Sequence, residues 1–190
     1  MLPRSGRVGW GILGMESSRR YFLGFGLAVA GGLLSPAARA AIETPRSLSF
    51  LHTHTGETLT ATYWENGSYL PDGLVVIDHI LRDFVTNTVV PINRPLLDLL
   101  ADLHGKLDSR EPFQIISAYR TPATNAMLSA ESTGVAKHSY HMKAMAIDIR
   151  LADVRLADLR RAAKDLGRGG VGMYPASNFV HVDTGPVRYW

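Results

Sequence analysis

The stretch that decides the fold is Ser139-Tyr140-His141-Met142-Lys143-Ala144-Met145-Ala146-Ile147-Asp148, and a related motif, His181-Val182-Asp183, follows later in the chain. Two histidines and two carboxylates therefore lie at the ends of short, apolar runs of the kind that form buried strands. Strands hold their side chains in fixed directions, so such runs can aim several polar groups at one point.

The spacing within these motifs indicates a bend and two strands. On one helix, His141 and Asp148 would be separated by about 10 Å along the axis, too far to share an ion. The chain must therefore fold back, and we expect the bend at Lys143-Ala144. In a strand over residues 145–150, Asp148 takes the face opposite its apolar neighbours, and His181 and Asp183 share one face of a strand over residues 179–183.

Together these side chains predict a metal centre. His141, Asp148 and His181 supply two nitrogens and one oxygen, a set typical of catalytic zinc, with a fourth position left for water. This predicts a zinc hydrolase. Taken singly, Asp148 could instead form a surface ion pair with Arg150, and His181 could form a hydrogen-bonded pair with Asp183 that stabilises a strand end. Asp183 is either a general base or the group that orients a ligand histidine.

A second set of polar residues follows a strand expected over residues 113–118. Arg120 presents a fixed fork of donors that could bind a polarised carbonyl oxygen or a substrate carboxylate, or could make a structural ion pair. Asn125 could add an amide contact. The expected substrate contacts are Ser117, Tyr119, Asn125 and Ser139.

The remaining pattern predicts an α+β fold: a single domain over residues 41–190, with helices packed around a small, mainly antiparallel sheet that carries the zinc site. A hairpin is expected over residues 47–63, with its turn at Gly56. Helices are expected over residues 74–84, 95–107, 123–128 and 156–166, with Asp72 and Asp153 as caps of the first and last. A loop is expected over residues 129–137, and further strands over residues 171–174 and 179–183.

Residues 1–40 have the parts of a removable signal peptide. Ser18-Arg19-Arg20 matches the twin-arginine export pattern, an apolar run follows over residues 22–34, and Ala38-Arg39-Ala40 is a small-residue cleavage site. The apolar run is shorter than the roughly 20 residues that cross a bilayer, so no permanent membrane anchor is expected. We expect export by the twin-arginine translocase to the periplasm or the medium.

The charge of the chain belongs largely to that segment. Residues 1–40 hold five arginines and one glutamate, a net of +4, whereas the whole chain carries +3, so the remainder is close to neutral at −1. No basic stripe remains to neutralise phosphates, and no nucleic-acid partner is expected. The chain has no cysteine, which excludes disulfides and leaves only His, Asp or Glu as metal ligands.

The combined motifs resemble those of the zinc peptidases that cleave cell-wall peptides, including the zinc D-Ala-D-Ala carboxypeptidases, the D-Ala-D-Ala dipeptidases and the murein endopeptidase K branch. The family pattern Ser-x-His-x-x-Gly-x-Ala-x-Asp, followed by His-x-Asp, is similar to residues 139–148 and 181–183. The endopeptidase branch adds two further matches, which here are Ser117, Tyr119, Arg120, Thr121, Pro122 and Asn125, then Phe179, Gly185, Pro186, Arg188 and Trp190.

The resemblance implies an exported zinc endopeptidase that hydrolyses peptide cross-links of peptidoglycan. It places zinc on His141, Asp148 and His181, with Arg120 near the substrate oxygen. The chain departs from the pattern at Ala144, where the family has glycine. It also carries Asn178 where the carboxypeptidases have a catalytic glutamate, which moves the base role to Asp183.

Two other functions fit the same residues. One is a non-catalytic, zinc-containing module that binds the cell wall, and the other is a zinc hydrolase of a different exported substrate.

Overall fold

The fold was analysed in a computed structural model, which describes residues 44–131 and 135–190. The predicted signal peptide lies outside these residues. None of the described helices is long and apolar enough to cross a membrane.

One sheet forms the centre of the domain. In the described part of the chain its eight strands run in the order β3-β2-β1-β4-β5-β7-β6-β8. Their bounds are β1 Arg46–His52, β2 Thr58–Glu65, β3 Ser68–Tyr69, β4 Phe113–Ser117, β5 Ala146–Arg150, β6 Gly170–Tyr174, β7 Phe179–Asp183 and β8 Arg188–Tyr189. Only the β1–β4 and β6–β8 pairs are parallel, which confirms the predicted α+β class and its mainly antiparallel sheet.

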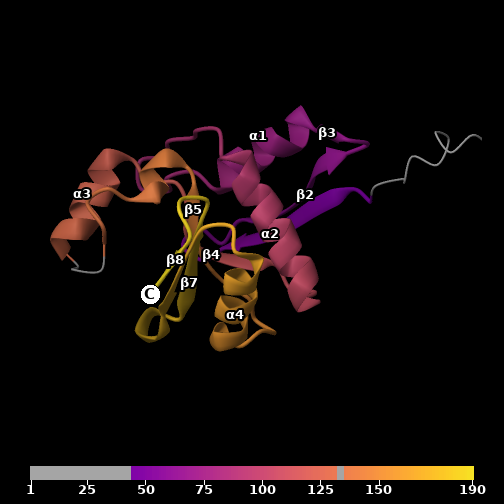
Figure 1. The fold of residues 1–190 in the computed structure, drawn as a ribbon. Helices are drawn as coiled ribbons and strands as arrows, with labels where there is room; N and C mark the ends of the chain where they lie inside the picture. Colours follow the sequence, from indigo (N-terminus) through magenta and orange to yellow (C-terminus); the bar gives the residue numbers. More distant parts are fainter. Residues whose placement is uncertain (1–43, 132–134) are drawn as a thin grey trace, which may run out of the picture. The chain divides into compact units, whose positions relative to one another are not determined.

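The helices cover the sheet unequally. They are α1 Pro71–Ile80, α2 Arg94–Leu107, α3 Pro122–Glu131 and α4 Leu156–Leu166, with short 3-10 turns η2 Tyr140–Lys143 and η3 Pro175–Ser177. Figure 1 shows α2 and α4 on one side of the sheet and α3 on the other side, beyond β5 and β8. Most leucines of α2 are buried in the hydrophobic core, as their spacing predicts, and Leu107 at its end is partly buried.

Strand alternation separates a core face from a polar face. Ile147, Val180 and Val182 are fully buried and belong to the hydrophobic core. Their neighbours Asp148 and His181 point to the other face, and strand pairing sets these two residues directly opposite each other. The predicted directions of these side chains are therefore confirmed, and the polar face of β5 and β7 carries the candidate site.

Several predicted boundaries are wrong for local reasons. Helix α1 begins at Pro71, after Leu70, and ends at Ile80, because residues 83–88 form a separate turn closed by an Asp83–Thr88 bridge. Asp153 does not cap α4, since its carboxylate accepts a hydrogen bond from the Ser109 hydroxyl. Helix α3 continues to Glu131, so residues 129–131 are helical rather than loop, and residues 132–134 lie outside the described chain.

Candidate metal centre

A tight turn presents His141 to the polar face of the sheet. The Ser139 side chain caps η2 by accepting a hydrogen bond from the His141 backbone N–H at 3.3 Å. The turn ends at Ala144, whose φ of 54° lies in the left-handed region, so the predicted bend is present. His141 Nδ1–H donates to the Ala118 carbonyl oxygen at 2.6 Å. This bond leaves Nε2 as the unprotonated nitrogen that faces the site.

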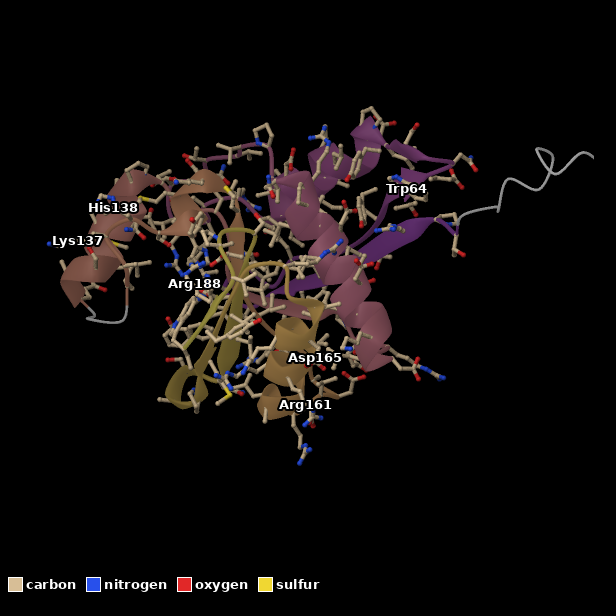
Figure 2. The ribbon with its side chains drawn as sticks, viewed as in Figure 1. Trp64, Lys137, His138, Arg161, Asp165 and Arg188 are labelled. Atoms are coloured by element: carbon tan, nitrogen blue, oxygen red, sulfur yellow. The ribbon has the colours of Figure 1, made fainter. Side chains whose placement is uncertain are left out.

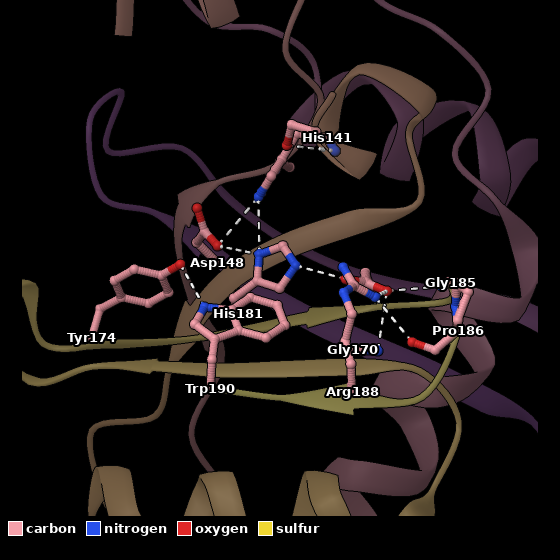
Figure 3. Close-up of polar contacts among 12 residues, drawn as sticks. His141, Asp148, Gly170, Tyr174, His181, Gly185, Pro186, Arg188 and Trp190 are labelled. Atoms are coloured by element: carbon pink, nitrogen blue, oxygen red, sulfur yellow. Dashed lines mark hydrogen bonds and ion pairs between the residues drawn. The ribbon is translucent and has the colours of Figure 1, made fainter. Parts of the chain in front are cut away.

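Asp148 and His181 approach the same point from paired strands. His181 Nδ1 lies 2.9 Å from Asp148 Oδ1, and its Nε2–H donates to Asp183 Oδ2 at 2.9 Å. Nδ1 is therefore the free nitrogen of this ring. Figure 3 shows the two imidazoles and the Asp148 carboxylate converging.

The three free atoms form a triangle suited to a four-coordinate cation. His141 Nε2 lies 3.2 Å from His181 Nδ1 and 3.2 Å from Asp148 Oδ1. Zinc bonds of about 2.0–2.1 Å at tetrahedral angles require ligand atoms about 3.3 Å apart. Within the described chain, these three residues offer ligand atoms that all lie within 4.8 Å of one another, close enough to hold one metal ion. Three unprotonated acceptors at this range repel one another unless a cation or a proton lies between them, so the donor set fits zinc.

The electrostatics of the metal-free cluster agree with this arrangement. Burial lowers the pKa of His141, and the Asp148 carboxylate only partly opposes that shift. Burial alone would raise the pKa of Asp148, but His141 and His181 hold it well below its usual range. Burial would likewise lower the pKa of His181, yet its hydrogen bonds with Asp148 and Asp183 raise it above 6.5. These shifts favour the ionised form of Asp148, and they favour a proton at His181 that competes with any metal.

Asp183 lies behind His181, away from the convergence point. Its side chain has no exposed surface. Oδ1 accepts hydrogen bonds from the backbone N–H groups of Gly170 and Gly185, and Oδ2 accepts from His181 and, at 2.6 Å, from Arg188. Burial raises its pKa, but these donors outweigh burial and the net pKa of Asp183 is low. Of the two roles predicted for Asp183, this placement favours the orienting role over that of general base.

Arg120 is bound to the cluster itself. Its NH2 group lies 2.5 Å from Asp148 Oδ2, and its Nε–H donates to the Ser117 hydroxyl at 2.7 Å. Arg120 therefore makes an ion pair, which was the predicted alternative to substrate contact. Its partner is Asp148. Arg150 instead donates to Gln114, so the surface pair between Asp148 and Arg150 is absent. Contact of Arg120 with substrate stays a prediction.

The cluster opens into a cavity of about 300 Å³. Its wall includes Arg120, His138, Ser139, Tyr140, His141, Asp148, Tyr174, Phe179, His181, Arg188 and Trp190. Figure 2 shows His138 beside α3, with Arg188 on the sheet across from it.

Of the four expected substrate contacts, only Ser139 lies in this wall. Ser117 supports Arg120, Tyr119 packs partly against the hydrophobic core, and Asn125 is buried and donates to the Ala136 carbonyl.

The sequence motifs included Arg188 and Trp190 but gave them no place in the site, and Tyr174 was not singled out. Tyr174 at the end of β6, Arg188 in β8 and Trp190 just after β8 all line the cavity. The spacing of Arg188 and Trp190, two residues apart, was a usable sign that both share one strand face. Tyr174 gave no comparable signal.

An α+β domain with a buried two-histidine, one-aspartate cluster beside a cavity has the architecture of a metallohydrolase. The chain belongs to the peptidase family described as Peptidoglycan L,D-endopeptidase MepK, whose pattern matches residues 40–190. It is 41% identical to the Peptidoglycan L,D-endopeptidase MepK of Escherichia coli strain K12, over 92% of this chain and 98% of that protein. It is 38% identical to the Probable peptidoglycan L,D-endopeptidase MepK of Haemophilus influenzae, over 92% and 96%. The resemblance drawn from the motifs is thus confirmed.

Proposed function

We propose that this protein is a zinc-dependent endopeptidase that hydrolyses peptide cross-links of peptidoglycan, at a bond between an L- and a D-configured centre. The observation that carries the proposal is the triangle of His141 Nε2, Asp148 Oδ1 and His181 Nδ1 in a chain of this family. Bound zinc would supply Lewis acidity, which activates water and polarises a peptide carbonyl.

The protein's own residues would hold and shape this site. Ala118 and Asp183 fix the two histidine tautomers, and Arg120 fixes the second oxygen of Asp148. Ser139 sets the turn that presents His141. The cavity wall then receives the peptide, with its aromatic side providing apolar contact.

Muropeptide analysis tests this function. Residues 41–190 are incubated with zinc and purified cross-linked peptidoglycan, and the released fragments are separated and identified by mass. We expect cross-linked fragments to be converted to shorter ones, and the His181→Gln protein to leave them intact. A zinc-loaded wild-type protein that binds peptidoglycan but releases no fragment would contradict the proposal and favour the wall-binding module.

We further propose export through the twin-arginine pathway, supported by Arg19-Arg20 and the small-residue site at Ala38-Arg39-Ala40. Residues 1–40 fused to a fluorescent reporter test this. We expect periplasmic fluorescence that the double substitution Arg19→Lys, Arg20→Lys abolishes. Export that survives this substitution would exclude the pathway.

A further inference from the structure

A tryptophan lies over a glycine beside the metal cluster. In the sheet, Gly172 pairs with His181 on one side, and β8 runs along its other side. A Cβ atom built on Gly172 would lie 2.4 Å from the Trp190 indole, so the indole occupies the space that a side chain would take. The indole and the His181 imidazole are 5.3 Å apart between ring centroids. Trp190 is thereby held at the edge of the candidate site.

Trp190 orients the hydroxyl group of Tyr174. Its indole Nε1–H donates to Tyr174 Oη at 2.8 Å. Because an indole N–H can only donate, the Tyr174 oxygen is the acceptor and its own hydrogen needs another partner. Within residues 44–131 and 135–190, no group accepts a hydrogen bond from this hydroxyl.

Packing fixes the place of the Tyr174 hydroxyl oxygen. The Tyr174 ring stacks on Phe179, with centroids 4.6 Å apart and planes 20° from parallel. Tyr174 lines the cavity together with His141, Asp148 and His181. Figure 3 shows the hydroxyl end of the Tyr174 ring directed toward Asp148 and His181. The cavity wall therefore holds a hydroxyl group, with its oxygen fixed in place, beside the metal cluster.

We propose that Tyr174 is a catalytic residue that donates a hydrogen bond to the scissile carbonyl oxygen, and that Trp190 positions it. The proposal rests on the proposed endopeptidase function. When water adds to the carbonyl carbon, a C–O bond forms and the C=O electron pair moves onto the carbonyl oxygen. The Tyr174 O–H stabilises that charge without giving up its proton. The pair then returns, the C–N bond breaks, and the leaving amine takes a proton derived from the water.

Two features make Tyr174 the suitable donor. A hydroxyl that accepts a hydrogen bond from Trp190 is polarised and donates more strongly. Arg120, the other candidate, already directs its Nε and NH2 groups to Ser117 and Asp148.

Steady-state kinetics on a defined cross-linked peptide test the proposal, with zinc content measured for each protein. We expect Tyr174→Phe to lower kcat by about 10²–10³-fold, the range for loss of one such donor, with KM and zinc content little changed. Trp190→Phe, which keeps a ring but lacks the N–H, should lower kcat by a smaller factor. The matched control is Tyr189→Phe, because the Tyr189 hydroxyl donates to the Lys164 carbonyl, outside the cavity wall. It should behave like the wild type.

The outcomes separate this proposal from the proposed function. If the wild-type protein cleaves the peptide and Tyr174→Phe retains its kcat, Tyr174 does not stabilise the reacting oxygen. An effect confined to KM would likewise overturn the proposal and leave a binding role. If the zinc-loaded wild type cleaves no cross-link at all, the endopeptidase function itself fails.

Discussion

The Asp183 side chain is fully buried and accepts five hydrogen bonds. These contacts decide whether it can act as a general base. A general base needs a lone pair directed at the reacting water. Both oxygens of Asp183 instead accept from His181, Arg188 and backbone N–H groups. We therefore expect Asp183 to act on the metal site through His181, whose tautomer it fixes.

We expect Asp183→Asn to weaken zinc binding by about 10–100-fold, the usual effect of losing a partner that orients a ligand histidine. At saturating zinc, kcat should recover to within a few-fold of the wild type. Competition with a chromogenic chelator gives the affinity, and peptide cleavage at rising zinc gives the recovery. The control is Asp153→Asn, an exposed carboxylate that contacts Ser109 and not His181. Full zinc affinity without turnover would instead identify Asp183 as the general base.

At the scale of elements, the buried carboxylate of Asp83 ties the turn over residues 83–88 to the chain just before α3. Asp83 Oδ1 accepts from the Val85 backbone N–H at 3.0 Å, and Oδ2 accepts from the Thr121 N–H at 2.8 Å. The Tyr119 N–H donates to the Leu81 carbonyl alongside. Leu81 and Asp83 therefore hold the chain on the two sides of Arg120.

Asp83→Asn should destabilise the fold in a pH-dependent way. Burial raises the pKa of Asp83, but hydrogen bonds from Thr124 and Thr121 outweigh burial and lower it from 3.8 to about 2. A depressed pKa means that the carboxylate stabilises the fold above pH 3.8 and that this contribution disappears as pH falls through 2. The shift corresponds to about 2 kcal/mol at neutral pH.

Urea unfolding of the wild type and of Asp83→Asn checks this result. The difference in the free energy of unfolding should be about 2 kcal/mol at pH 7 and should shrink between pH 4 and pH 2. Asp72→Asn, exposed in the first turn of α1, should cost less than about 1 kcal/mol. A pH-independent difference for Asp83→Asn would show that the charge plays no part.

The turn at Ala144 gives a second prediction at this scale. Among the described residues with positive φ, Ala144 alone is neither glycine, asparagine nor aspartate. Ala144→Gly should relieve about 1 kcal/mol of backbone strain and lose about 0.8 kcal/mol of methyl burial, so stability should change by less than about 0.5 kcal/mol. Ala144→Val should cost about 2 kcal/mol or more, because a β-branched residue rarely adopts this conformation. Thermal unfolding measures both, and equal effects would contradict the argument.

The elements also show what the sequence could predict. Alternation in residues 146–150 and 179–183 correctly gave two strands and the face of each polar residue. The Asp148–His181 pairing depends on strand register, which no local pattern encodes. The Asp153 cap was wrong because Ser109, distant in sequence, takes its carboxylate. Strand β8 was missed because it is only two residues long and forms by pairing with β6.

At the scale of the whole molecule, the sheet has the hydrophobic core on one face and the candidate metal site on the other. Apolar side chains of β4, β5 and β7 pack with α2 and α4 on one face. The cluster of His141, Asp148 and His181 lies on the opposite, polar face of β5 and β7. Because the strands that carry the ligands also form the core, metal binding should be coupled to global unfolding.

Zinc should therefore stabilise the folded protein, and it should do so more strongly at high pH. At a free zinc concentration 100 times Kd, the free energy of unfolding should rise by about 2.7 kcal/mol. In the metal-free site the pKa of His181 is raised above 6.5, so a proton holds Nδ1 at low pH and zinc must displace it. At one fixed concentration of free zinc, the zinc-induced rise in Tm should then be larger at pH 8 than at pH 6. The matched controls are His181→Gln, which should lose the rise, and His54→Gln, an exposed histidine outside the cluster, which should keep it. An equal rise in Tm for both variants would mean that zinc stabilises the protein from some other place.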